Sequence, residues 1–233
     1  MVAPAERVVT ECLRLGITVS PAAAAALVGL LDRMAVEPQN LTSVDVFADG
    51  VQRHLVDSLA GLVLESVRTA TSIVDLGSGG GFPGLPLAMA CPECAVTLVE
   101  SEGSKAEWLA RQAADLPNVR VVADRSEHLG MREREAWQVA TARALAPLPV
   151  LVELAAPLVA LGGTLVAWRG PRDLDEEGRA ARACDVLGLE PGPVTPVSVS
   201  AAADRHLHEY RKVRPTPDRF PRRPGRAAKR ALA

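Results

Sequence analysis

Apolar residues in the first third of the chain recur at helical spacing and show no strand pattern. Residues 5–15 place four apolar side chains on one helical face. Residues 20–34 begin with a serine followed by a proline, which is typical of a helix cap and a first-turn proline. Residues 51–64 predict a third helix, with leucines along one face. We therefore expect a helical N-terminal extension over residues 1–66.

From residue 71 the pattern changes to short β-rich runs separated by segments of helical length. The runs are residues 72–76, 95–100, 119–123, 138–142 and 164–168. Strands that alternate with helices in this way are typical of a parallel sheet. The sequence therefore predicts five parallel strands joined by helices.

Two local signals mark helix ends within this alternating region. Ser104 and Glu107 have the spacing of a capping box, which predicts the start of the helix after the second run. Gly162 and Gly163 follow a helical segment over residues 147–161 and predict its end, ahead of the fifth run. Both signals support the alternation of helices and strands.

Two further β-rich runs, residues 194–200 and 207–213, follow with no helix between them. Consecutive strands of this kind pair antiparallel, so we expect a hairpin at one edge of the sheet. The predicted fold class is thus α/β, with a mostly parallel sheet in residues 67–213, an antiparallel C-terminal hairpin and N-terminal helices. Four prolines beyond this region exclude regular structure, and we expect residues 214–233 to be extended or disordered.

Length and composition narrow the class of protein. The chain has 233 residues, which suits one α/β domain, and no apolar stretch approaches the roughly 18 residues of a membrane span. The first residues lack the pattern of a secretion signal, so we expect the cytoplasm as the location. Cys91 and Cys94 have the spacing of a redox pair. We interpret them as incidental because they flank a helix-to-strand turn and no second close pair exists for zinc.

Charge is distributed unevenly along the chain. Residues 205–230 hold ten lysines and arginines against two acidic residues, whereas the rest of the chain carries 16 basic and 26 acidic side chains. A basic C-terminal strip on an otherwise acidic chain favours contact with a polyanion such as RNA. A solubilising tail without a partner is the alternative. The candidate RNA-binding residues are Arg53, His54, Lys105, Arg211, Lys212, Arg222 and Arg223.

A glycine-rich segment joins the first predicted strand to the next helix. One register, G-x-G-x-x-G from Gly79, together with Glu100 about 20 residues on, fits a dinucleotide site. The other register places Asp75 ahead of Gly77, Gly79 and Gly81, and an acidic residue there suits the cationic ammonium of S-adenosylmethionine but repels a pyrophosphate. Glu100 suits ribose hydroxyls in either case. Asp75 therefore favours S-adenosylmethionine, and a nicotinamide-dependent oxidoreductase remains an alternative.

The chain resembles the glucose-inhibited division protein B family, the small-subunit ribosomal RNA guanine-nitrogen-7 methyltransferases. Pro83 and Pro86 after the glycines are particularly typical of that family's loop. The resemblance rests on residues 40–44, 53–59, 75–86, 141–144 and 205–207. It implies the Rossmann-like fold of class I methyltransferases, S-adenosylmethionine as cofactor, and 16S ribosomal RNA or the assembling small ribosomal subunit as partner.

The loop register and the resemblance together define a candidate site. The resemblance implies that the cofactor meets the loop, a Ser-Glu pair after the third strand and an arginine after the fourth. The candidate cofactor-binding residues are Asp75, Gly77, Ser78, Gly79, Gly81, Phe82, Glu100, Ser126, Glu127 and Arg143. The candidate catalytic residues are Arg143 and Arg205, and we expect no metal.

The expected reaction is methylation of guanine nitrogen-7. This nitrogen carries a lone pair and no proton, so the reaction needs alignment of the reacting atoms rather than a general base. Two alternatives remain: a methyltransferase of the same fold that acts on a protein or small molecule, and a non-catalytic RNA-binding assembly factor. We expect a monomer.

Overall fold

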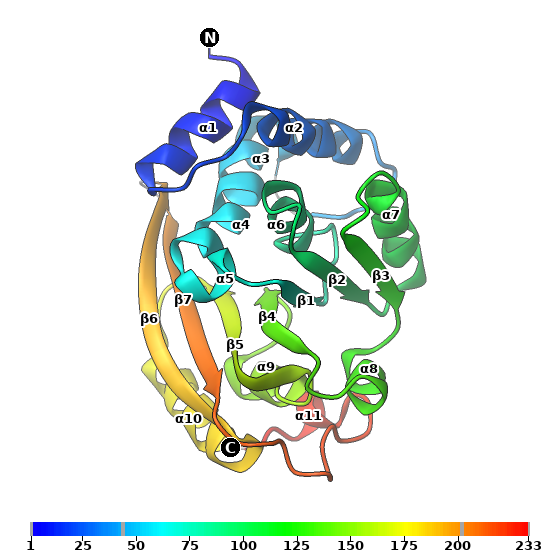
Figure 1. The fold of residues 1–233 in the computed structure, drawn as a ribbon, viewed down its shortest axis with the longest axis vertical. Helices are drawn as coiled ribbons and strands as arrows, with labels where there is room; N and C mark the ends of the chain where they lie inside the picture. The colour runs from blue at the N-terminus through cyan, green and yellow to red at the C-terminus, as the bar shows by residue number, and fades with distance from the viewer. Residues whose placement is uncertain (1, 43–44, 201–202, 233) are drawn as a thin grey trace.

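The computed structural model describes residues 2–42, 45–200 and 203–232 and has three layers, with helices on both faces of one sheet (Figure 1). The seven strands lie in the order β3-β2-β1-β4-β5-β7-β6. Their bounds are β1 Ser72–Leu76, β2 Ala95–Glu100, β3 Val119–Ala123, β4 Trp137–Arg143, β5 Val159–Arg169, β6 Leu189–Ser200 and β7 Ala203–Lys212. Strands β1 to β5 pair in parallel, and β7 pairs antiparallel with β5 and β6. This topology confirms the predicted fold class.

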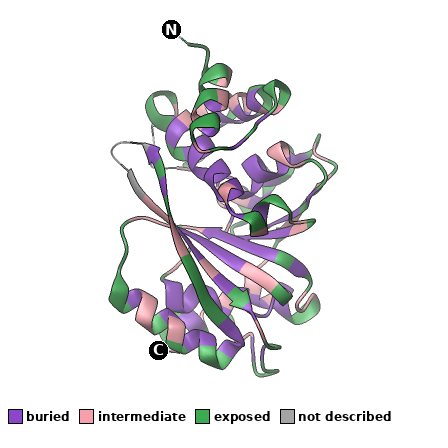
Figure 2. Ribbon diagram, turned by 60° about the vertical axis from the view of Figure 1, so that its left-hand side comes forward, coloured by how far each residue is buried: buried purple, intermediate pink, exposed green. Residues whose placement is uncertain are grey.

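The strand order reverses direction at β1, because the chain moves outward to β3 on one side and to β5 on the other. Loops that leave the carboxyl ends of β1 and β4 therefore diverge and open a crevice, where ligands of such sheets bind. The inner strands are buried along most of their length (Figure 2). A ligand-binding site is therefore expected among the polar groups at the carboxyl ends of these strands.

Helices cover both faces of the sheet. Above it in Figure 1 lie α1 (Pro4–Arg14), α2 (Pro21–Ala35), α3 (Val46–Gly50), α4 (Asp57–Leu59), α5 (Glu65–Arg68), α6 (Gly84–Ala90) and α7 (Gly103–Ala113). Below it lie α8 (Ser126–Arg132), α9 (Leu148–Ala155), α10 (Leu174–Leu187) and α11 (Arg226–Lys229). Successive residues of a strand point to opposite faces of the sheet. Ile73 belongs to the hydrophobic core between the sheet and the helices α1 to α7, and Val74 belongs to the core on the opposite face, beside α8 to α11.

The N-terminal helices share the core of the sheet. Val8 of α1 and Leu27 of α2 are fully buried in the same hydrophobic cluster as Ile73 and Leu98. The predicted serine cap is present, since the Ser20 hydroxyl accepts the backbone N–H of Ala23. The first helices therefore share one hydrophobic core with the sheet.

The two predicted helix ends, a start capped by Ser104 and an end at Gly162 and Gly163, were both wrong. Helix α7 begins at Gly103 after Glu102, and the Ser104 hydroxyl donates to the Glu102 carboxylate at 3.2 Å instead of capping the helix. Gly162 and Gly163 lie inside β5, because the left-handed Gly162 (φ +81°) accommodates an irregularity in its pairing with β4. The glycines therefore bend a longer strand and do not end a helix.

The prediction that residues 214–233 are extended or disordered was wrong in part, because the described residues 214–232 are docked on the domain and include the short helix α11. Phe220 is 2% exposed and packs into the core below the sheet. The Arg134 guanidinium donates to the Phe220 carbonyl at 2.6 Å and to the Pro217 carbonyl at 3.2 Å. The prolines do exclude regular structure around Phe220, but the folded domain supplies the partners that this backbone lacks. The tail is therefore docked through residue 232.

Within residues 2–42, 45–200 and 203–232, no helix combines the length and apolar character that a bilayer span requires.

Candidate functional site

The glycine loop between β1 and α6 forms the floor of the crevice. Gly77, Gly79 and Gly81 have positive φ values of +63°, +53° and +107°, which glycine adopts without strain. A Cβ at Gly77 would lie 2.4 Å from the Leu145 Cδ1 atom. A Cβ at Gly79 would meet only the Gly77 carbonyl at 3.8 Å, so the loop is open to a ligand on that side.

Asp75 supports this loop from below. Its side chain has no exposed surface, and its carboxylate accepts the Thr141 hydroxyl at 2.8 Å and the Gly84 N–H at 3.3 Å. Burial outweighs these bonds and raises the pKa of Asp75 to about 6. This differs from the direct ammonium contact predicted from the sequence, because the end of β1 turns the side chain under the loop. Asp75 therefore shapes the loop.

Glu100 ends β2 beside the same loop. Its carboxylate accepts the Gly79 N–H at 2.9 Å and the Glu102 N–H at 2.8 Å, and the residue is 9% exposed. Two acceptor oxygens at this position offer further lone pairs to hydroxyl donors. Glu100 is thus placed as a ribose-binding residue would be.

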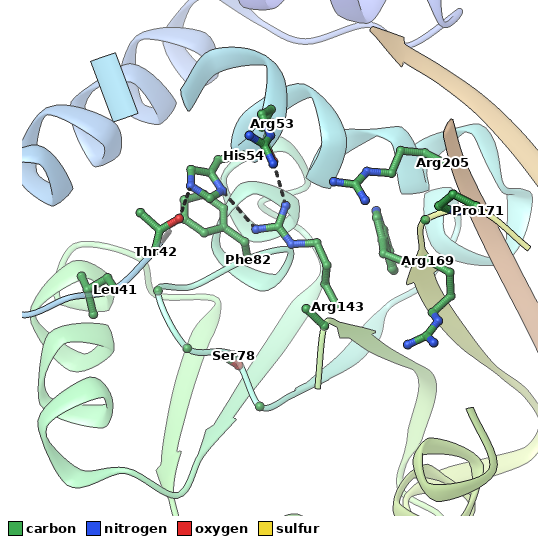
Figure 3. A pocket seen from close by; sticks show the side chains of 16 residues that line it. Leu41, Thr42, Arg53, His54, Ser78, Phe82, Arg143, Arg169, Pro171 and Arg205 are labelled. Atoms are coloured by element: carbon green, nitrogen blue, oxygen red, sulfur yellow. Dashed lines mark hydrogen bonds between the residues drawn. The ribbon is translucent and has the colours of Figure 1, made fainter. Parts of the chain in front are cut away.

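A cleft of about 680 Å³ lies above the loop, and its walls are strongly cationic (Figure 3). The side chains of four arginines, Arg53, Arg143, Arg169 and Arg205, line it. Its other lining residues are Leu41, Thr42, His54, Gly77, Ser78, Gly79, Gly80, Phe82, Ala144, Trp168, Gly170 and Pro171. The cleft therefore combines a glycine floor with a surface suited to an anion.

Arg143, the last residue of β4, is fixed by several contacts. Its guanidinium donates to the Asp57 carboxylate at 2.8 Å and to the Arg53 carbonyl at 3.1 Å. The guanidinium carbon lies 5.2 Å from the centroid of the Phe82 ring, within cation–π range. Arg205 lies 3.0 Å from the other oxygen of Asp57. One buried carboxylate therefore holds both predicted catalytic arginines at the cleft.

Asp57 was not among the predicted site residues. It follows a π-helical segment, Val51–Val56, and that segment was predicted as ordinary helix. The Trp168 indole at the end of β5 donates to the Asp57 carbonyl at 2.8 Å and anchors this region over the strand ends. A π-helix is rare and has no sequence signature, although it is frequent at functional sites.

His54 stacks on Phe82, with 4.5 Å between ring centroids and an interplanar angle of 12°. An Arg143 nitrogen lies 3.2 Å from its Nδ1 atom, and because a guanidinium only donates, Nδ1 accepts. The neutral ring then carries its proton on Nε2 and donates to the Thr42 hydroxyl at 2.8 Å. Burial first, and then the charges of Arg143 and Arg53, lowers the pKa of His54 to about 4.

We expect His54 to titrate near pH 4 in the folded protein. The unfolded chain takes up this proton near pH 6.5, so the contribution of His54 to stability is complete above pH 6.5 and is lost as the pH falls toward 4. Nuclear magnetic resonance of the imidazole carbons measures the midpoint, with a His54→Gln sample to assign the signal. A midpoint near 6.5 would contradict the buried, neutral ring.

A second hollow of about 120 Å³ lies on the other side of Gly77. It is lined by Gly77, Val99, Ser101, Asp124, Arg125, Ser126, Glu127, Leu145 and Leu154. Because both hollows share Gly77, they adjoin across the loop. The structure thus brings the predicted Ser126 and Glu127 to the far side of the loop from Arg143.

The predicted RNA-binding residues differ in their exposure and in their contacts. Lys212 has no exposed surface, and its ammonium contacts the Ala156 carbonyl, Thr216 and Glu135, so the predicted phosphate contact is wrong. Arg222 forms a two-bond ion pair with Glu153, which is 2% exposed, while the Arg222 side chain itself is 22% exposed. The long side chains of both residues reach inward to buried acceptors.

Of the other predicted RNA-binding residues, His54 is 4% exposed, and the remaining four lie nearer the surface. Arg53 lies at the cleft, 3.9 Å from Asp49 in an exposed pair. Lys105 pairs with Glu102 at 2.7 Å. Arg211 and Arg223 are exposed. The family-like segment at residues 40–44 is described only to Thr42, since residues 43–44 lie outside the described residues.

Comparison with known proteins identifies the family. The family model described as GidB, rRNA small subunit methyltransferase G, matches residues 23–208. A ribosomal RNA small subunit methyltransferase G from Chloroflexus aggregans is 44% identical over 197 residues, covering 83% of this chain and 82% of the relative. The protein of that name from Deinococcus radiodurans is 38% identical over 218 residues, covering 91% and 86%.

Solved structures show the same fold at low sequence identity. A variant of the 16S rRNA (adenine(1408)-N(1))-methyltransferase from Catenulisporales acidiphilia has a TM-score of 0.54 and 15% identity, over 66% of this chain and 90% of that one. Aeropyrum pernix fibrillarin, solved with S-adenosyl-L-methionine, has a TM-score of 0.52 and 17% identity, over 66% and 72%. The fold is that of class I methyltransferases, and the extent of the family match shows that the chain belongs to the rRNA small subunit methyltransferase G family.

Proposed function

We propose that this protein transfers the methyl group of S-adenosylmethionine to nitrogen-7 of a guanine in 16S ribosomal RNA. One observation carries the proposal: the glycine loop and the arginine pair held by Asp57 face the same cleft at the carboxyl ends of the strands. Membership of the methyltransferase G family supports the RNA substrate. The other cleft wall is formed by the segment that carries Arg53 and His54.

The residues around Gly77 fit an elongated cofactor with an apolar base and a polar end. Leu145 and Leu154 give the smaller hollow apolar walls, while Ser126 and Glu127 supply polar groups for an adenine. Glu100 would accept the ribose hydroxyls, and the backbone of Gly77 and its neighbours would pass beneath the methionine part. When bound, the cofactor supplies a methyl group on a positively charged sulfur.

Methylation of guanine nitrogen-7 requires no proton transfer, which agrees with the protonation state of His54 in the cleft. The lone pair of the nitrogen forms the new bond to carbon while the carbon–sulfur bond breaks, and the positive charge passes to the base without release of a proton. No general base is required, and His54 is not one, because its Nδ1 is engaged by Arg143 and its pKa is about 4. Its task is to hold Arg143 in place.

The arginines would bind and orient the RNA. Arg143 and Arg205 are held at one carboxylate, so their positions are set before the substrate arrives. Their outer N–H groups can donate to phosphate or to the guanine carbonyl oxygen. Among the predicted surface cations, Arg53, Lys105, Arg211 and Arg223 remain candidates for phosphate contacts. We also propose that the chain divides into segments at residues 66 and 213, that the protein is a monomer and that it is located in the cytoplasm.

We expect Glu100→Gln to weaken cofactor binding by about 1–3 kcal/mol, the usual range for loss of a charge-assisted hydrogen bond. In the glutamine variant the amide nitrogen would also face the N–H of Gly79 or of Glu102. Two donors would then meet at a position where the Glu100 carboxylate accepts a hydrogen bond. Calorimetric titration with S-adenosylmethionine measures the effect. Glu102→Gln is the matched control, because its side chain is 54% exposed two residues away. Equal affinities in both variants would place the ribose elsewhere.

The same titration separates the proposed function from its alternatives. We expect the wild-type protein to bind S-adenosylmethionine and not NAD. Binding of NAD alone would favour an oxidoreductase, and binding of neither would favour an RNA-binding assembly factor. A methyltransferase that acts on proteins or small molecules would bind the cofactor but leave ribosomal RNA unmethylated.

A further inference from the structure

The far wall of the smaller hollow is held from outside by the C-terminal tail. The Glu127 carboxylate, which lines this hollow and is 3% exposed, accepts the Gly225 N–H at 2.9 Å. Arg125 donates to the same carboxylate at 3.2 and 3.3 Å, which are longer contacts. Residues almost 100 positions apart therefore share one carboxylate at the candidate cofactor site.

Gly225 is fixed in place by the residues just ahead of it. Arg222 binds the buried Glu153 of α9 through two nitrogens and donates to the Arg230 carbonyl at 2.8 Å. Phe220 anchors the preceding turn in the core. In Figure 1 this segment runs beneath α9 toward α8, the helix that carries Glu127. The ion pair and the aromatic anchor thus hold the Gly225 N–H at Glu127.

We propose that residues 214–232 are part of the cofactor site and act as a positioning segment that holds Glu127 for the adenine end of the cofactor. The inference rests on the proposed function, since it assigns the smaller hollow to the adenine. The tail does so through the backbone N–H of Gly225, while arginines such as Arg223 are exposed on its surface.

The electrostatics of Glu127 agree with this role. Burial raises its pKa, but the bonds from Arg125 and Gly225 outweigh burial and bring the pKa below the usual value. The side chain stays ionised, and its Oε2 atom, whose contacts from Arg125 and Ser126 are long at 3.3 and 3.4 Å, is the acceptor that an amino group on the ligand could engage. Without the tail, Glu127 loses its shortest contact from a distant residue and keeps the longer contacts from its neighbours Arg125 and Ser126, so the wall loosens.

Arg222 and Arg223 provide a matched test, because they are adjacent and equally charged but only Arg222 pairs with Glu153. We expect Arg222→Ala to weaken S-adenosylmethionine binding roughly tenfold, comparable to the loss of a hydrogen bond to a charged group. Its KM for the cofactor should rise by a similar factor, with kcat at saturating cofactor nearly unchanged. Arg223→Ala should leave both cofactor constants at wild-type values. Equal cofactor affinity in the two variants overturns the inference.

Hydrogen exchange on the wild-type protein gives a second test that does not depend on the folding of a variant. Because coupling between two sites is reciprocal, S-adenosylhomocysteine should slow amide exchange in residues 222–230. Unchanged exchange in that segment, with the ligand shown to be bound, overturns the inference while the proposed function stands. Failure of the wild-type protein to bind either ligand would instead overturn the proposed function.

Discussion

Gly77→Val is expected to abolish binding of S-adenosylmethionine and, with it, methyl transfer. The φ of +63° at Gly77 is strained for a β-branched residue, and a Cβ there would lie 2.4 Å from Leu145 Cδ1. Gly77 also separates the two hollows, so any shift of the backbone disturbs both ends of the candidate site. Calorimetry with S-adenosylmethionine should give no measurable heat of binding.

Gly103→Ala is the control for this variant. Gly103 begins α7, has no positive φ, and a Cβ there would meet nothing within 4 Å. It should bind the cofactor as the wild type does, and circular dichroism should show that both variants are folded. Normal affinity in a folded Gly77→Val protein would remove the glycine loop from the cofactor site.

Asp57→Asn is expected to reduce methyl transfer about 100-fold, the scale of loss when groups near the reacting atoms move by an ångström. The change keeps the shape of a side chain that is 1% exposed but removes the charge between Arg143 and Arg205. Breaking a buried pair on one side costs about 3–5 kcal/mol, and the partial exposure of Arg205 brings this toward the lower end. Radioactive methyl incorporation and a thermal melt measure the two effects.

The helix before Asp57 offers its own control. Asp49 pairs with Arg53 at 3.9 Å, with both side chains about half exposed, and such pairs contribute little. Asp49→Asn should therefore retain wild-type activity and stability. If Asp57→Asn also retained wild-type kcat, the arginine cluster would have no part in the reaction.

The strand pattern of the sequence predicted the sheet because each strand contains a β-rich run, although β5, β6 and β7 extend beyond the runs that were predicted. The glycine loop and Glu100 were found for the same reason, since the loop follows the first predicted strand and Glu100 ends the second. Arg143 was found through its place at the end of β4 and through the family resemblance. These features depend on residues near one another in the chain. In the structure the glycine loop and Arg143 line one cleft, and Glu100 contacts the loop at Gly79.

Other features depend on contacts between distant residues and were missed. Asp57 lies in the family-like segment 53–59, but its pairing with Arg143, 86 positions away, depends on the π-helical segment before it. The tail looked unstructured because its prolines exclude local hydrogen bonds, while its partners, Arg134 and Glu153, lie in the folded domain. Lys212 carries a charge that predicts exposure, yet Glu135 and the Ala156 carbonyl satisfy it inside the protein.

One measurement tests the central claim most directly. Small ribosomal subunits from a strain that lacks this gene are incubated with the purified protein and S-adenosylmethionine, and the digested 16S RNA is analysed by mass spectrometry. The structure and the family predict one new 7-methylguanosine per RNA molecule with the wild-type protein and none with Gly77→Val. A methyl group on another base, or none at all with a protein that binds the cofactor, would contradict the account.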